Sequence, residues 1–228
     1  MTSEELAARI DQTLLKPDAL QSDYENFLEM SSKYSFSSVC IPPHYVKLAS
    51  KVLDAGPVKV STVVGFPLGY SGAETKVFEA KKAYDDGAEE IDVVANISLI
   101  KSNNMFFVAE EIGRITSAVP YATVKVIVEC CHLNDAEKVA ACKAVINGGA
   151  HFVKTSTGFG PWGARVVDVK LLAKTSEGTI KVKAASGIKT VSDALAMIKA
   201  GADRIGTPSG VEIVEEFRKN FQNKSAER

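Results

Sequence analysis

The chain has 228 residues, of which 46% are hydrophobic, so it can bury a large core, and α/β barrels of this length commonly form one domain. Its formal net charge of −1 gives no electrostatic footprint for nucleic acid or for an anionic membrane surface. Residues 1–5 lack the basic and apolar regions of a signal peptide, and no apolar run reaches membrane-spanning length. The cysteines have no disulfide-framework spacing, which is typical of reduced thiols in a cytoplasmic protein: Cys40, Cys130, Cys131 and Cys142.

Short β-branched runs alternate with longer amphipathic segments along the chain. The predicted strands are residues 9–14, 37–41, 59–64, 90–95, 123–129, 151–155, 180–184 and 203–206. The predicted helices include residues 73–86, 106–118, 135–147, 166–175 and 192–200. Glycine supplies a left-handed helix end at low cost, and Gly-Ala pairs close three of these helices: Gly87-Ala88, Gly149-Ala150 and Gly201-Ala202.

Eight strands in alternation with helices predict an α/β fold, a closed (β/α)8 barrel with a short N-terminal helix. A doubly wound open sheet is the main alternative. No linker or low-complexity stretch divides the chain, so we expect one domain over residues 1–228. In a barrel the active site lies at the C-terminal ends of the strands.

A lysine ends one of the predicted buried strands. Lys154 follows the apolar run 150–153 and precedes the small residues 155–158. A buried lysine is costly if it is charged and unpaired, whereas a neutral lysine amine is a nucleophile toward carbonyls. Lys183 ends the next strand in the same way, so each lysine should make the other harder to protonate.

Side chains alternate between the two faces of a strand, which predicts the residues that face the barrel interior. On the strand 123–129 the apolar alternation leaves Lys125, Ile127 and Glu129 facing inward. Lys181 shares a face with Lys183 but lies toward the solvated bottom of the barrel. Acids and lysines can satisfy one another when they are buried together. The predicted inner cluster is Asp11, Asp92, Glu129, Lys154 and Lys183.

Motifs in nearly every βα unit, from about Arg9 to Gly210, occur in the order found in one aldolase family. The most specific is KTSTG at residues 154–158, directly after an apolar strand. The others are DQTLLKP at 11–17, VVGFPLG at 63–69, EIDVV at 90–94 and RIGT at 204–207. On these segments the chain resembles deoxyribose-phosphate aldolase.

The resemblance implies a TIM barrel and a class I aldolase with no metal or organic cofactor. Such enzymes reversibly cleave 2-deoxy-D-ribose 5-phosphate to acetaldehyde and D-glyceraldehyde 3-phosphate, in deoxyribose catabolism. The implied partners are small phosphorylated sugars and aldehydes, with neither nucleic acid nor membrane. A homo-oligomer, dimer or tetramer, is the family expectation.

The resemblance also implies roles for individual residues. Lys154 would form the Schiff base, Lys183 would hold it neutral, and Asp92 would relay protons through a water. Asp11, Thr13 and Glu129 would orient these groups or contact substrate hydroxyls, while backbone amides would cradle the phosphate. Cys40 is a small core residue whose thiol could react with aldehydes if it lay near the mouth. The predicted substrate-binding residues are Asp11, Thr13, Cys40, Glu129, Thr155, Gly158, Ser186, Gly187, Gly206 and Ser209.

Three departures from the family pattern bear on phosphate affinity and leave the lysine–aspartate chemistry intact. Ser186 replaces a glycine, so its amide is a phosphate donor only if its backbone avoids positive φ. Pro208 has no N–H to donate. Gln12 stands where many members have histidine.

Two other functions remain open. One is a Schiff-base enzyme of the same fold with a different donor or acceptor aldehyde. The other is a barrel that works mainly as a binding or structural partner, against which the retained Lys154, Lys183 and Asp92 argue.

Two local motifs carry little weight. Residues 158–163 match G-x-G-x-x-G, but the next strand ends without the acidic residue that a dinucleotide fold requires. Residues 129–132, Glu-Cys-Cys-His, would point in opposite directions along a strand, so we predict no metal site there.

Overall fold

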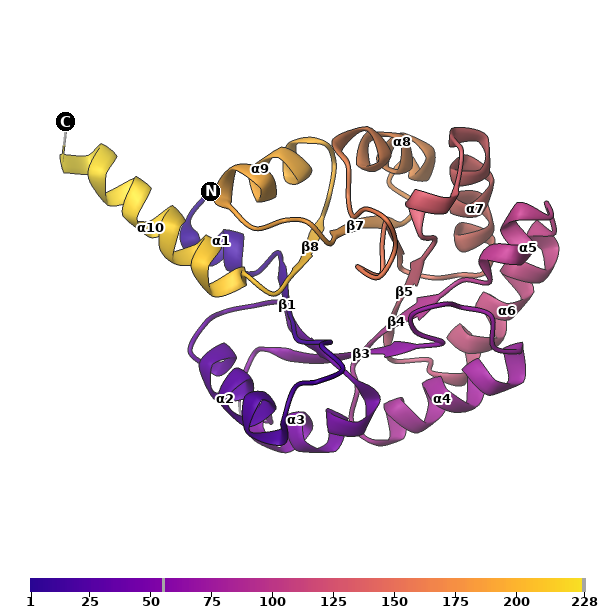
Figure 1. The fold of residues 1–228 in the computed structure, drawn as a ribbon, viewed down its shortest axis with the longest axis horizontal. Coiled ribbons are helices and arrows are strands. Elements are labelled where there is room, and N and C mark those ends of the chain that lie inside the picture. The colour runs from indigo at the N-terminus through magenta and orange to yellow at the C-terminus, as the bar shows by residue number, and fades with distance from the viewer. Residues whose placement is uncertain (55, 227–228) are drawn as a thin grey trace.

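The computed structural model describes residues 1–54 and 56–226, and at its centre lies a closed barrel of parallel strands. Each strand pairs with the next in chain order, and β8 pairs with β1 (Figure 1). The predicted (β/α)8 barrel is therefore confirmed, and the open doubly wound sheet is excluded. The strands are β1 Ile10–Thr13, β2 Ser38–Ile41, β3 Lys59–Val64, β4 Glu90–Val94, β5 Thr123–Ile127, β6 Phe152–Lys154, β7 Lys181–Ala185 and β8 Arg204–Thr207. The predicted domain, 1–228, includes Ala55, Glu227 and Arg228, which lie outside the described residues.

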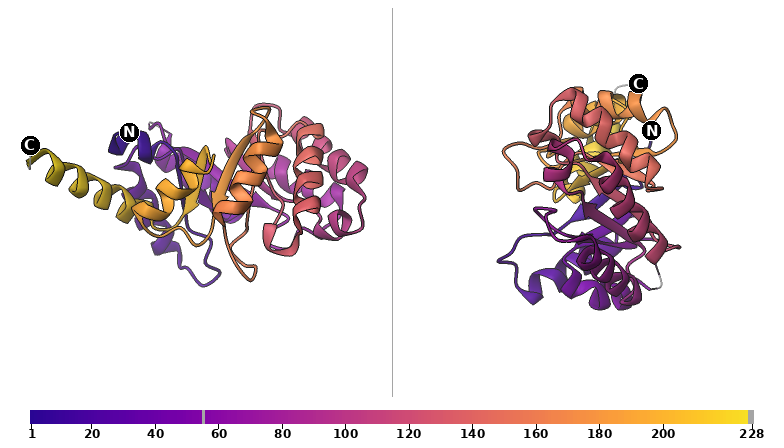
Figure 2. Two further views of the ribbon diagram at one scale, coloured as in Figure 1. Left: turned by 90° about the horizontal axis from the view of Figure 1, so that it is seen from above. Right: turned by 90° about the vertical axis from the view of Figure 1, so that its right-hand side faces the viewer.

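Helices connect the strands and form the outer ring of the molecule, while the last helix, α10, extends away from the barrel (Figures 1 and 2). The predicted N-terminal helix is α1, Ser3–Ala7, whose first turn is held by a capping box between Thr2 and Glu5. None of the helices in the described part of the chain is long and apolar enough to span a bilayer. The other helices are α2 Gln21–Ser32, η1 Pro43–Tyr45, α3 Val46–Leu53, α4 Ala73–Asp85, α5 Ile97–Lys101, α6 Met105–Ala118, η2 Cys130–His132, α7 Asp135–Asn147, α8 Val166–Ser176, α9 Val191–Lys199 and α10 Gly210–Ala226.

The element boundaries follow the predicted ranges closely, with one informative exception. Gly87, Gly149 and Gly201 have φ of +107°, +73° and +109°, which confirms the left-handed glycines after α4, α7 and α9. The predicted strand 123–129 instead ends at Ile127, and Glu129 has a left-handed backbone with φ of +53°. The alternation of side chains therefore fails at Glu129.

The apolar core lies between the barrel and its helices, whereas the barrel interior is strongly charged. On β5, Val124 and Val126 are fully buried in the apolar core, and Lys125 between them is fully buried on the other face. Each neighbouring strand repeats this division. The core-facing residues of the barrel include Val39, Val60, Ile91, Val93, Val153, Val182 and Ile205.

Helices α6 and α7 pack closely at Gly148, where a Cβ atom would lie 2.5 Å from Cγ2 of Ile112. We expect Gly148→Ala to lower the free energy of unfolding by about 1–3 kcal/mol, because overpacking displaces the helices. Gly113→Ala on α6 is the matched control, since its Cβ would meet only the carbonyl oxygen of Gly148, at 3.9 Å. Alanine at position 113 should raise the free energy of unfolding by about 0.5–1 kcal/mol, because alanine favours the helix more than glycine does. Urea unfolding midpoints should move in opposite directions, and shifts of the same sign would contradict this account.

Candidate active site

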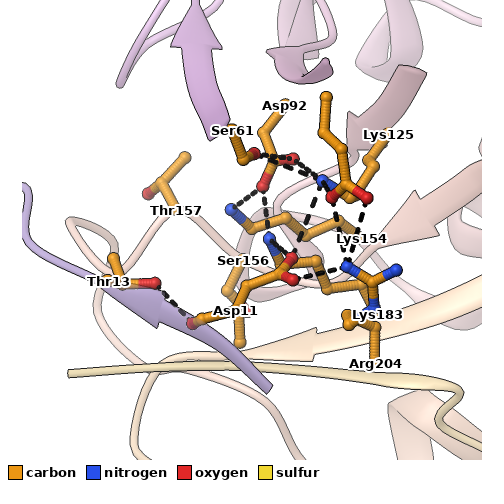
Figure 3. Close-up of polar contacts among 12 residues, drawn as sticks. Asp11, Thr13, Ser61, Asp92, Lys125, Lys154, Ser156, Thr157, Lys183 and Arg204 are labelled. Carbon is orange, nitrogen blue, oxygen red and sulfur yellow. Dashed lines mark hydrogen bonds and ion pairs between the residues drawn. The ribbon is translucent and has the colours of Figure 1, made fainter. Parts of the chain in front are cut away.

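A buried carboxylate on β4 lies at the centre of the barrel interior. Oδ2 of Asp92 accepts hydrogen bonds from Nζ of Lys154 at 2.7 Å and from Nζ of Lys183 at 2.6 Å (Figure 3). Its Oδ1 accepts a hydrogen bond from Nζ of Lys125 at 2.8 Å. We call the ion-paired residues around it the charge cluster: Asp11, Glu90, Asp92, Lys125, Lys154, Lys183 and Arg204.

Two further carboxylates complete the charge cluster. Asp11 on β1 lies 2.5 Å from Nζ of Lys183 and 2.5 Å from Nη1 of Arg204. Glu90 on β4 lies 2.6 Å from Nζ of Lys125 and 3.1 Å from Nη1 of Arg204. Each carboxylate thus contacts at least two basic groups, which meets the condition for burying charge.

The strand register explains why the two lysines meet. Lys154 on β6 and Lys183 on β7 are direct partners, and neighbouring strands are about 5 Å apart. Asp92 on β4 is in the same way the direct partner of Lys125 on β5. These placements confirm that Lys125, Lys154 and Lys183 face the interior. Lys181 is exposed, as predicted for the bottom of the barrel.

The two lysines differ in their tendency to hold a proton. Burial lowers the pKa of the Lys154 amine and the charge of Lys183 lowers it further, against the opposing effect of Asp92. Burial also acts to lower the pKa of Lys183, but Asp11 and Asp92 outweigh it, so the pKa of Lys183 is raised. The predicted effect of Lys183 on Lys154 is therefore confirmed, whereas the direction of the Lys183 shift is set by Asp11 and Asp92.

A cavity of about 380 Å³ opens at the C-terminal ends of β1, β6, β7 and β8. Lys154 lines this cavity and is 3% exposed, whereas Asp92 and Lys183 lie behind it and are fully buried. Much of the wall is apolar, formed by Leu14, Leu15, Pro17, Phe159 and Ile188. The exposed Lys16 and Lys189 add positive charge to the same wall. The cavity therefore offers one buried amine to a ligand that carries both apolar and anionic parts.

The predicted substrate-binding residues fall into two groups. Five line the cavity: Thr13, Gly158, Ser186, Gly187 and Gly206. The other five, which do not line it, are Asp11, Cys40, Glu129, Thr155 and Ser209.

The residues outside the cavity wall have other contacts. Asp11 and Cys40 are fully buried inside the barrel, so the Cys40 thiol does not lie at the mouth. Oγ1 of Thr155 accepts a hydrogen bond from the backbone N–H of Ala185 at 3.2 Å, which ties β6 to β7. The Ser209 N–H donates to Oγ1 of Thr207 at 3.0 Å.

Glu129 is not part of the charge cluster, and its predicted place there is wrong. Because its backbone is left-handed, its carboxylate turns toward the loop after β6. Oε2 accepts hydrogen bonds from the backbone N–H of Thr157 at 3.1 Å and from the Thr157 hydroxyl. Oγ1 of Thr157 in turn accepts from the N–H of Phe159 at 3.0 Å. Thr157 and Phe159 line the cavity, so Glu129 shapes its wall from behind.

Three members of the charge cluster were missing from the predicted inner cluster: Glu90, Arg204 and Lys125, of which only Lys125 was predicted to face inward. Strand alternation places Glu90 on the same face as Asp92 and Arg204 on the same face as Gly206, so a signal was present. Strand alternation does not, however, show which side chains contact one another across the barrel.

The loops expected to bind phosphate have lost amide donors. Ser186 was expected to donate its amide to phosphate only if its φ was not positive, and its φ is +74°. Its N–H instead donates to the carbonyl of Gly206 at 3.4 Å. The carbonyl of Pro208 accepts a hydrogen bond from Nε2 of Gln12 at 3.0 Å, and Oε1 of Gln12 accepts from the N–H of Gly210 at 2.8 Å. Gln12 therefore holds the loop after β8 against β1.

The segment 129–132 has no metal-binding geometry. Cys130–His132 form a single 3-10 turn in which both cysteines are buried. Nowhere in residues 1–54 and 56–226 do three His, Cys, Asp or Glu side chains gather as a ligand set.

Glu129→Ala should lower the free energy of unfolding by about 1–3 kcal/mol, because it leaves the Thr157 N–H and hydroxyl without their acceptor. Glu129→Gln keeps an acceptor oxygen and the same left-handed backbone, so it should retain most of that stability. Urea unfolding of the two variants measures the difference. Equal losses would mean that the hydrogen bonds to Thr157 are not what the carboxylate contributes.

Comparison with known proteins identifies the family. Residues 6–216 match the model of the DeoC/LacD family of aldolases. The deoxyribose-phosphate aldolase of Caldicellulosiruptor saccharolyticus is 51% identical over 219 residues, covering 95% of this chain and 100% of the relative. That of Caldanaerobacter subterraneus subsp. tengcongensis is 51% identical over 217 residues, covering 94% of each chain.

Solved structures share the same fold. The aldolase QR15 superposes with a TM-score of 0.91 at 45% identity, covering 95% of this chain and 97% of the other. A tetrameric deoxyribose phosphate aldolase from Aeropyrum pernix superposes with a TM-score of 0.88 at 37% identity, covering 95% and 92%. The buried lysine pair, the cavity and these relatives agree: the chain belongs to the DeoC/LacD family of aldolases.

Proposed function

We propose that the protein is a class I deoxyribose-phosphate aldolase that reversibly cleaves 2-deoxy-D-ribose 5-phosphate to D-glyceraldehyde 3-phosphate and acetaldehyde. One observation carries the proposal: of the seven residues in the charge cluster, Lys154 alone lines the cavity, and its pKa is lowered. The names of the curated relatives support the choice of substrate.

In this mechanism the free amine of Lys154 attacks the aldehyde carbon, C1, and the carbinolamine takes up one proton and loses water to give an iminium ion. A base takes the proton of the 3-hydroxyl group, and the electron pair of the C2–C3 bond moves into the iminium to form an enamine. Glyceraldehyde 3-phosphate departs. Protonation of the enamine at C2 and hydrolysis then release acetaldehyde and restore the amine.

Asp92 has two roles in the proposal. Burial alone would raise its pKa, but Lys125, Lys154 and Lys183 together hold the pKa of Asp92 well below its usual range. The carboxylate is therefore ionised at neutral pH and balances the positive charge of the iminium, since it lies 2.7 Å from Nζ of Lys154. Through a water it relays protons to and from the substrate. Lys183 supplies the repulsion that favours the free amine of Lys154.

The phosphate lies at the outer end of the cavity in this proposal. The exposed Lys16 and Lys189 provide charge there, and Gly158, Gly187 and Gly206 line the same cavity, where their backbone amides would contact the phosphate. A homo-oligomer in the cytoplasm remains a prediction, and the tetrameric relative from Aeropyrum pernix supports oligomerisation.

Trapping tests the imine directly. Incubation with deoxyribose 5-phosphate and borohydride should leave a reduced adduct on Lys154, mapped by mass spectrometry. Lys154→Ala should abolish the adduct and lower kcat/KM by about 10³-fold or more. Lys181→Ala is the control, because this lysine is exposed at the other end of β7 and should keep both adduct and activity. An adduct on Lys183 would reverse the two roles, and no adduct on the folded protein would favour a binding partner.

Substrate discrimination tests the phosphate end. Lys16→Ala and Lys189→Ala should each raise the KM for deoxyribose 5-phosphate about tenfold, because a charge-assisted contact with phosphate is lost. The KM for unphosphorylated deoxyribose should hardly change. Lys174→Ala on α8 is the control, since this exposed lysine does not line the cavity. Equal effects on both sugars would favour the Schiff-base enzyme with a different acceptor.

A further inference from the structure

The barrel interior holds more basic groups than carboxylates. Asp11, Glu90 and Asp92 supply three negative charges, and Lys125, Lys154, Lys183 and Arg204 supply four groups able to carry a positive charge. Full protonation would leave one positive charge without a counterion, and such burial is costly. The cluster is balanced when one basic group is neutral.

The ion pairs indicate which group that is. Lys125 lies within ion-pair distance of all three carboxylates, at 2.6 Å from Glu90, 2.8 Å from Asp92 and 3.6 Å from Asp11. Lys183 is paired with Asp11 and Asp92, and Arg204 with Asp11 and Glu90. Among the described residues, Lys154 has Asp92 as its only carboxylate. The basic group with the fewest carboxylate partners is therefore Lys154, the residue that lines the cavity.

We propose that Glu90 and Lys125, which do not line the cavity, are positioning residues that set the pH at which Lys154 becomes a free amine. Both are buried, and both act through Asp92. Lys125 shares the Asp92 carboxylate with Lys154, and Glu90 pairs with Lys125 at 2.6 Å. The catalytic consequence rests on the proposed function, but the ionisation of Lys154 does not.

The two residues act with opposite sign. Without the Glu90 carboxylate the cluster has more excess positive charge, so the ammonium form of Lys154 is less stable and its proton leaves at lower pH. Without Lys125 the three carboxylates face three basic groups, so Lys154 keeps its proton to higher pH. Loss of both leaves the original excess of one basic group.

Every strand around Lys154 contributes to this balance. The charged groups facing the interior are Asp11 from β1, Glu90 and Asp92 from β4, Lys125 from β5, Lys183 from β7 and Arg204 from β8. β2 contributes Cys40, whose thiol stays neutral because burial raises its pKa. β3 contributes Ser61, which hydrogen-bonds to Asp92 at 3.4 Å and carries no charge.

Competitive acetylation by acetic anhydride measures the ionisation of Lys154, because only the free amine reacts. The extent of labelling is read by mass spectrometry from about pH 5 to pH 10 in the parent, Glu90→Gln, Lys125→Met and the double variant. The midpoint should fall by about one pH unit in Glu90→Gln and rise by about one unit in Lys125→Met. In the double variant it should return to within about half a unit of the parent.

Shifts of the same sign in the two single variants, or no shift in either folded variant, would overturn the proposal. If Lys125→Met does not fold, Arg204→Met replaces it, because it also removes a positive charge and should raise the midpoint. The parent protein gives an independent test: the labelling midpoint of Lys154 must lie below the ordinary lysine value of about 10.4, and a midpoint at or above that value overturns the balance without any variant. A purely structural role for Glu90 and Lys125 would change the urea midpoint without opposite pH shifts.

The same proteins separate this inference from the proposed function. If labelling shifts as expected but deoxyribose 5-phosphate is not cleaved, the proposed function fails and the inference stands. If cleavage occurs with an unshifted labelling midpoint in both folded single variants, the aldolase assignment stands and the roles of Glu90 and Lys125 are refuted.

Discussion

The interior of this barrel depends on the hydrogen bonds that one carboxylate accepts from three lysines. Asp92 binds Lys125, Lys154 and Lys183 at 2.6–2.8 Å with no solvent exposure of its own. Removing one partner from a buried ion pair destabilises a protein by about 3–5 kcal/mol, because the remaining charge is left without compensation. Three lysines share this one partner. Together with Asp11 and Glu90, which pair with Lys125, Lys183 and Arg204, Asp92 lets the barrel hold charge where most barrels hold packed apolar side chains.

The two faces of the barrel strands have different roles: the outward face forms the apolar core and the inward face carries the charged residues. The outward faces of the strands pack against the helices through Val, Ile and Ala side chains, which supply the hydrophobic stabilisation. The inward faces are thereby free to carry ionisable groups. Lys154 belongs to the charge cluster and also lines the cavity, and only 3% of its surface is exposed. It is therefore almost fully shielded from bulk water.

The sequence predicted correctly which side chains face the barrel interior wherever the two-residue alternation of a strand is unbroken. Alternation on β5, β6 and β7 placed Lys125, Lys154 and Lys183 inside the barrel, and the parallel register brought the last two together. The same reasoning failed at Glu129, because a left-handed residue ends the alternation and the sequence does not show where that happens. At position 186, where serine replaces the family's glycine, the sequence raised the question of a positive φ but could not decide it, and the structure has φ of +74°. Contacts across the barrel, such as that between Glu90 and Arg204, depend on the stagger of the strands, which local pattern does not specify.

Gln12 links the two ends of the barrel sheet at the place where the cavity opens. Its side chain joins the first strand to the loop after the last one, through Pro208 and Gly210, and Asp11 beside it pairs with Arg204 on β8. The seam at which the two ends of the chain meet is therefore also a wall of the cavity. During synthesis, the ribosome must release β8 before this wall can exist, even though Asp92 and Lys154 emerge much earlier. A partly made chain would carry Lys154 without a finished cavity, so the environment of this lysine is complete only once the last strand has joined the barrel.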